Sequence, residues 1–249
     1  MTLGSSTTAD GITPNSQPDY AYDAPPIFFA KDAAPSGAEV YNVLDDGEGA
    51  DSVYAGAGND MITLVADAAR DTVRGGDGID SLDLSAASAD IDVIFGSKAF
   101  AGVTRGGGLG ITSFSSIEKI LGSSFSENVR GGAGAETYIL KGGNDTISAG
   151  GGADTIWGGL GLDRATGGLG NDVFAFAKAD FTAGVRDVVI DFHEAAGDKD
   201  VLRLQGALGD YNFAAGPAGS VIVTEIASGG SVQLLHITLG ALTDQLAFF

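Results

Sequence analysis

The sequence predicts an all-β solenoid of short parallel strands that ends in a β-rich cap. Residues 122–175 divide without a gap into six nine-residue units, GSSFSENVR, GGAGAETYI, LKGGNDTIS, AGGGADTIW, GGLGLDRAT and GGLGNDVFA. The fourth position is glycine in the last five units. The sixth position is always acidic: Glu127, Glu136, Asp145, Asp154, Asp163 and Asp172. The eighth position is mostly apolar: Val129, Tyr138, Ile147, Ile156, Ala165 and Phe174.

The nine-residue spacing predicts how each unit folds. Glycine at the first, second and fourth positions allows positive φ, so we expect a tight turn there. The last three residues are expected to be extended, and because side chains alternate along a strand, the eighth points inward. Two units then close one coil. A disordered glycine-rich tract would need no apolar residue at every ninth position, so the pattern disfavours that alternative.

The acidic positions predict a bound cation. Acidic side chains two units apart stack on the same edge of the coils, about 4.8 Å apart. Like charges at this distance repel one another unless a cation lies between them. Calcium suits such an edge because it takes roughly six to eight oxygen ligands from carboxylates and backbone carbonyls. The repeats therefore predict Ca²⁺ as the bound ion.

The composition narrows the classes of partner. The chain has 249 residues, 40 of them glycine, and a formal net charge of −20 at pH 7. This charge argues against nucleic acid, anionic membranes and polyanionic sugars, and favours cations. Without cysteine the chain forms neither disulfides nor thiolate metal sites. No apolar run approaches the roughly 20 residues of a membrane span, and the first residues do not resemble an export signal peptide.

The chain is expected to divide into five segments. They are an extended N-terminal arm (1–37), a first repeat array (38–83), spacer coils that continue the solenoid (84–121), a second repeat array (122–175) and a C-terminal cap (176–249). Five of the six prolines lie in the arm, which is expected to be largely unstructured except where Ile27–Phe29 packs on the first coil. Alternating or apolar side chains predict strands at 39–43, 90–95, 187–192, 201–204, 220–225 and 232–237.

The first array is shorter and less regular than the second. Its sixth-position acids are Asp51, Asp60, Asp71 and Asp80. The unit that ends after Asp71 slips by two residues and lacks glycine in its turn. Asp60 with Asp80 is therefore the better-formed pair.

These nonapeptides resemble the repeats-in-toxin (RTX) family of secreted bacterial proteins. The likeness extends over residues 46–249. It includes the spacer sequences GGDGIDSLDLS and SSIEKILGSSFSENVRGG, the segments DVVIDF and GDKDVLRL, and the terminal LGALTDQLAFF, which resembles the uncleaved signal of type I export. The resemblance implies a right-handed parallel β-roll with calcium in the turns. It also implies secretion from a Gram-negative bacterium by a type I secretion apparatus, without a cleaved N-terminal signal.

The resemblance also implies a set of calcium ligands. In the RTX family the sixth-position aspartate supplies a carboxylate, and the glycines at positions 2 and 4 supply carbonyl oxygens. In the first array this gives Asp51, Gly56, Gly58, Asp60, Asp71, Gly76, Gly78 and Asp80. In the second array it gives Gly143, Asp145, Gly150, Gly152, Asp154, Gly159, Gly161, Asp163, Gly168, Gly170 and Asp172. Asp145 then pairs with Asp163, and Asp154 with Asp172. Glu127 and Glu136 depart from aspartate and are left out of the set.

No enzyme is predicted. His193–Gly197 begins like the zinc motif H-E-x-x-H but ends in glycine, and no G-x-S-x-G or P-loop pattern occurs. Trp157, at an outward position, is expected to make a capped surface contact rather than to bind a ligand.

We expect a secreted, non-catalytic calcium-binding protein. Its expected role is adhesion to an extracellular surface or matrix ligand, part of a surface layer, or an exported calcium-binding protein. One alternative is the export and folding module of a secreted hydrolase or toxin. Another is an ice- or carbohydrate-binding solenoid, which the absence of a regular threonine ladder at the outward positions disfavours.

Overall fold

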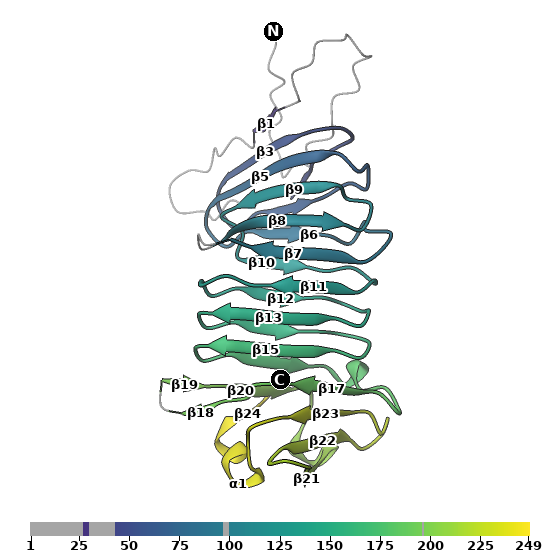
Figure 1. Ribbon diagram of the computed structural model, residues 1–249, viewed down its shortest axis with the longest axis vertical. Helices are drawn as coiled ribbons and strands as arrows, with labels where there is room; N and C mark the ends of the chain where they lie inside the picture. The colour runs from purple at the N-terminus through teal and green to yellow at the C-terminus, as the bar shows by residue number, and fades with distance from the viewer. Residues whose placement is uncertain (1–26, 30–42, 97–99, 196) are drawn as a thin grey trace.

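The computed structural model describes residues 27–29, 43–96, 100–195 and 197–249. These residues form a parallel β-roll whose coils stack along one axis, with a β-rich cap at the C-terminal end (Figure 1). The predicted all-β roll is confirmed. Most of the expected N-terminal arm, and the strand predicted at 39–43 except for its last residue, lie outside the described residues.

Two sheets make the roll. The first sheet has, in spatial order, β1 (Ile27–Phe29), β3 (Ser52–Ala57), β5 (Arg70–Asp77), β9 (Ile111–Ser115), β8 (Ala101–Gly106), β7 (Ile91–Phe95), β11 (Glu127–Arg130), β13 (Thr146–Gly151), β15 (Arg164–Leu169), β17 (Arg186–Val189), β23 (Ser231–Leu234), β22 (Val221–Glu225) and β21 (Tyr211–Ala215). The second has β2 (Val43–Asp45), β4 (Met61–Thr63), β6 (Ser81–Asp83), β10 (Lys119–Leu121), β12 (Thr137–Ile139), β14 (Thr155–Trp157), β16 (Val173–Phe176), β20 (Val201–Leu204) and β24 (Leu246–Phe248).

In the second array the register follows the predicted coil of two nonapeptides. Thr137 of β12 lies beside Thr155 of β14, and Thr146 of β13 beside Arg164 of β15, all in parallel strands. Successive units alternate between the two sheets, so equivalent positions two units apart become neighbours. This register places the sixth positions of alternate units side by side.

The core is a column of apolar side chains between the two sheets. The eighth-position residues of the second array are all buried: Val129, Tyr138, Ile147, Ile156, Ala165 and Phe174. Inward-facing residues at first positions, such as Leu140 and Ala149, are also fully buried. Since burial of a large apolar side chain contributes roughly 1.5–3 kcal/mol, this column is the main apolar stabilisation of the roll.

Glycine permits the tight turns at positions 2 and 4. Gly159 and Gly161 have φ of 94° and 136°, which L-residues with a side chain rarely adopt. A Cβ at Gly161 would also overlap the carbonyl oxygen of Gly143 in the preceding coil. Successive turns therefore stack backbone on backbone, with no space for side chains between them.

The spacer differs from the expected wider coils. Its strands β7, β8 and β9 form an antiparallel meander, while β9 pairs in parallel with β5 and β7 in parallel with β11. The first sheet thus continues through the meander without interruption, and in the second sheet β6 pairs directly with β10. The alternation of Asp90–Phe95 correctly predicts β7, but it carries no information on strand direction.

The cap closes the last coil. The antiparallel strands β21, β22 and β23 continue the first sheet beyond β17, and β22 with β23 is the predicted hairpin. The remaining elements are η1 (Lys178–Asp180), β18 (Glu194–Ala195), β19 (Asp198–Lys199), η2 (Leu208–Asp210), α1 (Leu239–Leu242) and η3 (Thr243–Gln245). Strand β24 pairs in parallel with β20, so the segment that resembles an export signal is built into the cap.

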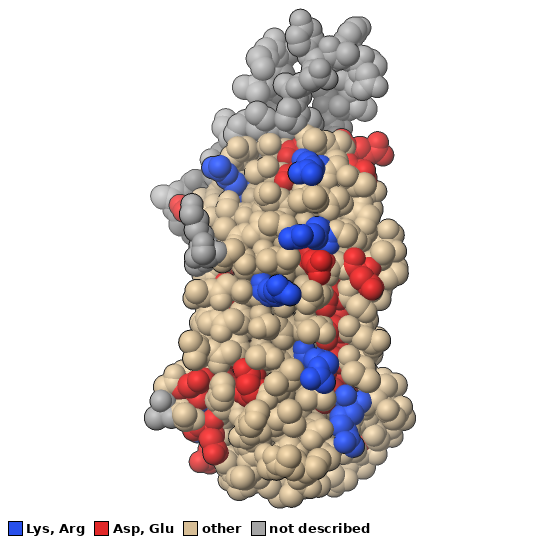
Figure 2. All heavy atoms as spheres, in the orientation of Figure 1, with Lys and Arg blue, Asp and Glu red and all other residues tan. Residues whose placement is uncertain are grey.

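The surface carries less charge than the composition suggests. Most of the face seen in Figure 2 is neither acidic nor basic, although the net charge is −20. Many carboxylates are buried instead, and they are described below. Among the described residues, no helix has the length and apolar character needed to cross a membrane.

Candidate metal centre

Two columns of acidic residues run along the two edges of the roll. The first edge column contains Asp51, Asp71, Glu127, Asp145, Asp163 and Asp187, which lie at the starts of strands of the first sheet. The second edge column contains Asp60, Asp80, Glu118, Glu136, Asp154, Asp172 and Asp200, at the starts of strands of the second sheet. All are buried except Glu118, which is half-buried.

Within each column a carboxylate of one coil accepts a backbone N–H from the coil before it. In the second array the Glu127 N–H donates to Asp145 Oδ1 at 2.7 Å, and the Asp145 N–H to Asp163 Oδ1 at 2.9 Å. On the other edge the Asp154 N–H donates to Asp172 Oδ1 at 2.8 Å. The structure thus brings together the pairs expected from the sequence, Asp145 with Asp163 and Asp154 with Asp172.

The first array has the same arrangement. The Asp51 N–H donates to Asp71 Oδ1 at 3.1 Å, and the Asp60 N–H to Asp80 Oδ1 at 2.8 Å. At the spacer the first edge column is interrupted. There the Thr112 hydroxyl donates to Asp71 Oδ2 at 3.3 Å in place of a further carboxylate contact.

The second oxygen of many of these carboxylates is buried without a hydrogen-bond partner. Among the described residues this holds for Oδ2 of Asp80, Asp145, Asp154, Asp163 and Asp172, and for Oε2 of Glu127. A buried carboxylate oxygen without a donor or a counter-charge carries a large desolvation penalty. Rows of such oxygens, all on the turn edges, provide the hard oxygen ligands that Ca²⁺ requires. The residues present therefore fit calcium.

Burial shifts the protonation of these groups. Burial, together with the nearby charges of Glu136 and Asp172, raises the pKa of Asp154 to about 7. Burial likewise raises the pKa of Asp163 to about 6 and that of Asp187 to about 7. In the absence of a cation the folded roll thus keeps these carboxyls protonated at pH values well above their ordinary pKa of 3.8.

The turn glycines of the expected ligand set all have positive φ: Gly56, Gly58, Gly76, Gly78, Gly143, Gly150, Gly152, Gly159, Gly161, Gly168 and Gly170. Their turns are held to one another by backbone bonds, such as Gly143 N–H to Leu160 O at 2.9 Å and Gly152 N–H to Leu169 O at 2.8 Å. These bonds stack the turns of successive coils along each edge of the roll.

Glycine at the first position has a different role from the one expected. Gly75, Gly158 and Gly167 do not adopt positive φ, so the expectation of positive φ at this position is wrong. Instead, a Cβ at Gly158 would overlap the carboxylate of Asp163, and one at Gly167 that of Asp172. The first glycine of a unit therefore makes space for the acidic side chain of the same unit.

Sequence reasoning missed several members of the columns. Glu118 lies nine residues before Glu127, in phase with the repeat, and its Oε2 accepts the Asp80 N–H at 2.8 Å. Asp187 and Asp200 accept the N–H groups of Asp163 and Asp172 at 2.9 and 3.0 Å. Glu118 could have been found from its spacing. The other two follow longer connections, where the nine-residue period no longer applies.

Asp46 is a further buried carboxylate at the N-terminal end of the roll. It is 1% exposed, and its Oδ1 accepts the Val65 N–H at 2.7 Å. Burial raises its pKa to about 8. Asp46 is the first residue of its nonapeptide unit, a position that faces the core. The equivalent residue in the second array is the buried Leu140. The sequence position of Asp46, the first residue of a unit, gave no reason to single it out.

The glutamates find local partners. Glu127 Oε1 accepts the Ser123 N–H at 3.1 Å and the Ser123 hydroxyl, while the Tyr138 hydroxyl lies 3.5 Å from Glu136 Oε2. Each longer side chain therefore reaches a group in or next to its own unit. Trp157 makes the capped contact expected of it: its Nε1 donates to Asp180 Oδ2 at 2.8 Å, and its ring packs edge-on against Phe249.

The raised pKa values predict that the metal-free protein becomes less stable as the pH rises. The folded-state pKa of Asp154 is above its ordinary value of 3.8, so between about pH 4 and 7 the folded state binds more protons than the unfolded state. The metal-free fold should therefore lose stability as pH rises from 5 to 8. Calcium requires deprotonated carboxylates, so the stability gained from calcium should increase over the same range. Thermal unfolding in calcium and in chelator, at steps from pH 5 to 8, measures this. In chelator the melting temperature should fall with rising pH until the transition disappears; a melting temperature in chelator that rises with pH contradicts the prediction.

A pair of glycine substitutions tests whether the first glycine of a unit makes space for the acidic side chain. Gly158→Ala should displace the Asp163 carboxylate, lower stability in saturating calcium by roughly 1–3 kcal/mol and weaken calcium binding. Gly151→Ala is the matched control, because its Cβ would meet only Leu169 at 3.9 Å, and it should change stability by less than about 1 kcal/mol. Denaturant unfolding and calcium titration of both variants give the answer. Equal effects would show that the first glycine does not make space for the carboxylate.

Comparisons with known proteins agree with the repeat pattern. The family model of the RTX calcium-binding nonapeptide repeat matches four copies, at residues 42–64, 65–88 and 139–174. A comparison with curated proteins finds no sequence match.

The solved structures that resemble this chain include two at low identity. The AlgE6R3 subunit of the Azotobacter vinelandii mannuronan C5-epimerase is 22% identical with a TM-score of 0.37, over 51% of this chain and 80% of that one. The extracellular lipase LipA from Serratia marcescens is 19% identical with a TM-score of 0.33, over 83% of this chain and 38% of the lipase. The chain thus spans less than half of the lipase. Residues 42–64, 65–88 and 139–174 of this chain therefore carry repeats that match the RTX calcium-binding nonapeptide.

Proposed function

We propose that the protein is a secreted, non-catalytic calcium-binding β-roll that folds when it meets calcium outside the cell. The observation that carries the proposal is the set of buried carboxylate oxygens without partners along both edges of the roll. Within this proposal calcium supplies the positive charge that lets these oxygens stay buried and deprotonated. Its ligands are the expected aspartates and turn glycines, extended by Glu118 and Asp187.

The magnitudes support a folding switch. Extracellular calcium modules bind with Kd of roughly 10⁻⁴–10⁻³ M. At millimolar calcium each such site adds about 0.4–1.4 kcal/mol to stability. Several sites together then become comparable with the ~5–15 kcal/mol of a typical folded domain. At the much lower free calcium of a cytosol this contribution disappears, and the chain remains unfolded.

The carboxylates of the columns are unsuited to catalysis. One oxygen of Asp145, Asp154 and Asp163 is held by a backbone N–H, and the other is buried. A general acid or base has to reach a proton of its substrate, which a fully buried oxygen does not. This favours a structural role for the roll, with binding to an extracellular surface or matrix as its expected use.

Secretion by a type I apparatus is the second part of the proposal. An unfolded, acidic chain without calcium is suited to passage through an exporter, and calcium outside favours folding and retention there. The segment Leu239–Phe249 resembles the signal for such export. In the folded protein the Gln245 amide donates to His193 O at 2.6 Å and to Asp200 O at 3.0 Å, and Leu242 is buried. The same segment therefore also completes the cap.

Calcium titration followed by far-UV circular dichroism tests the folding switch. In chelator at pH 8 we expect little β-structure, and addition of calcium should restore the β spectrum cooperatively. Asp154→Asn should shift the midpoint to higher calcium because it alters a buried ligand. Asp244→Asn is the control, since it removes the same charge from an exposed side chain of the cap and should leave the midpoint unchanged. A spectrum that is β-rich in chelator and unchanged by calcium would contradict the proposal.

Export is tested by deletion with a matched cap variant. In cells with a type I exporter, removal of residues 240–249 should abolish appearance of the chain in the medium. Leu204→Asp is the control, because it disturbs the buried contacts of β20 beside β24 but keeps the terminal segment intact. This variant should still be exported, as shown by immunoblot of cells and medium. Export of the deleted chain, or equal loss in both variants, would show that the segment acts only in the cap.

A further inference from the structure

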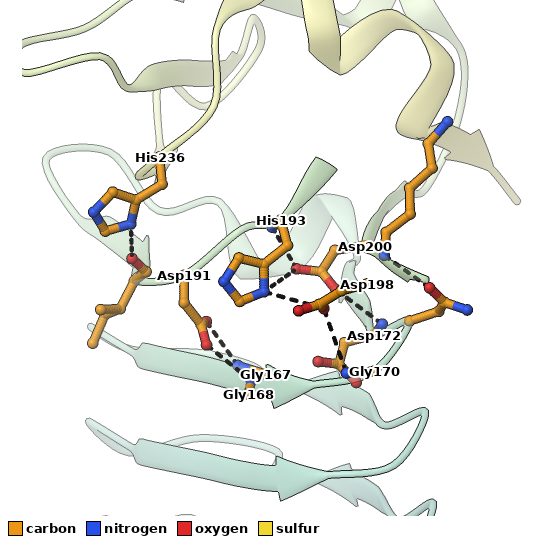
Figure 3. A network of polar contacts seen from close by, with 12 residues as sticks. Gly167, Gly168, Gly170, Asp172, Asp191, His193, Asp198, Asp200 and His236 are labelled. Atoms are coloured by element: carbon orange, nitrogen blue, oxygen red, sulfur yellow. Dashed lines mark hydrogen bonds and ion pairs between the residues drawn. The ribbon is translucent and has the colours of Figure 1, made fainter. Parts of the chain in front are cut away.

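A histidine joins the carboxylates where the last repeat meets the cap. The loop from Asp191 to Asp200 follows β17 and carries His193, Asp198 and Asp200, whose ligand atoms lie within 4.8 Å of one another (Figure 3). His193 Nδ1 is 3.2 Å from Asp198 Oδ1 and 3.9 Å from Asp200 Oδ2. The nonapeptide units have ended by this point, so His193 and its neighbours lie where a further repeat turn would otherwise follow in the second edge column.

The contact between His193 and Asp198 is close but lacks the alignment of a hydrogen bond. Nδ1 of His193 is buried and has no hydrogen-bond partner among the described residues, although Asp198 Oδ1 is only 3.2 Å away. Two ligands of one ion approach each other side by side in this way. Zinc with bonds of roughly 2.0–2.2 Å to nitrogen and oxygen brings tetrahedral ligand atoms to about 3.3 Å from one another.

The last repeat holds the cluster through backbone groups. The Asp172 N–H donates to Asp200 Oδ1 at 3.0 Å, and the Gly170 N–H donates to Asp198 Oδ1 at 3.4 Å (Figure 3). The Asp172 carboxylate itself faces the preceding coil, where its Oδ1 accepts the Asp154 N–H at 2.8 Å. The carboxylates of Asp198 and Asp200 are therefore anchored to the roll, while His193 comes from the segment that leads into the cap.

The backbone of the cluster is fixed before any ion binds. The His193 N–H donates to Asp200 Oδ2 at 2.7 Å, and the Asp200 N–H donates to His193 O at 3.1 Å. The Gln245 amide holds His193 O from the cap side at 2.6 Å. A preorganised ring and carboxylates need little rearrangement to bind a metal.

We propose that His193 Nδ1, Asp198 and Asp200 form a site for a divalent transition ion such as Zn²⁺, with water as the remaining ligand. Imidazole nitrogen suits zinc, copper and nickel, whereas calcium takes oxygen ligands. The site therefore differs in ion class from the turn edges. Because Asp198 and Asp200 each accept a backbone N–H of the last repeat, a bound ion would strengthen the junction between the roll and the cap.

Zinc and cobalt titrations of the full chain test the proposal. With the protein folded in saturating calcium, calorimetry should detect one equivalent of bound Zn²⁺, and Co²⁺ should give the absorption bands of a nitrogen-containing site. His193→Asn should lower zinc affinity by more than the roughly tenfold loss caused by removing a supporting hydrogen bond. His236→Asn is the matched control, since His236 is the other of the two histidines and its Nδ1 contacts Ile190 O at 2.9 Å. It should bind zinc as the unmodified chain does.

Two further measurements keep the outcome decisive. Circular dichroism in calcium first shows whether His193→Asn is folded; if it is not, Asp198→Asn replaces it in the titration. Zinc affinity that is unchanged in the folded variant overturns the proposal. Displacement of zinc by a modest excess of calcium also overturns it, because the cluster would then be an ordinary calcium site. Neither result depends on whether calcium folds the chain or on how the chain is exported.

Discussion

The roll depends on one repeated interaction, a buried carboxylate that accepts a backbone N–H from the preceding coil and leaves its second oxygen without a partner. The Asp145 N–H to Asp163 Oδ1 bond, at 2.9 Å, is representative. The bond fixes the stacking of coils, but it also places a row of negative charges in a low-dielectric edge. Without a cation the same groups that set the register oppose the fold.

Other features of the repeat follow from this interaction. The carboxylate occupies the space above the first glycine, so a side chain at Gly158 would displace it. Positive φ at Gly159 and Gly161 brings the turns of successive coils into backbone contact. The eighth-position residue follows the acid by two residues and points the same way, into the core. The same alternation of side chains along the strand therefore positions both the acidic residues of the edges and the apolar residues of the core.

The sequence predicts the fold where the period of nine holds and loses accuracy where it does not. In residues 122–175 the register, the inward residues and the carboxylate pairs all follow from spacing, since a single geometry repeats. In the spacer the alternation of Ile91–Phe95 predicts a strand, but nothing local distinguishes an antiparallel meander from a wider coil. Strand direction there is set by pairing with β5 and β11, which are distant in sequence.

The candidate sites show the same limit. Asp187 and Asp200 continue the two columns, but the connections before them are longer than a nonapeptide, so spacing could not identify them. The role of the first glycine in making space for the Asp163 carboxylate could not be predicted either. A glycine in a turn can be required by positive φ or by lack of space for a side chain, and only the three-dimensional structure distinguishes the two. His193 was rejected as part of a zinc motif along the chain, and its neighbours Asp198 and Asp200 become relevant only when the loop folds back on itself.

Hydrogen exchange at individual amides tests the central claim most directly. The N–H groups of Glu127, Asp145 and Asp163, each donated to a carboxylate of the next coil, report on the columns themselves. The account predicts that at pH 8 these amides are protected in calcium and exchange at the rate of an unfolded chain in chelator. Protection that persists in chelator at pH 8 would contradict it, because the columns would then be stable without a cation.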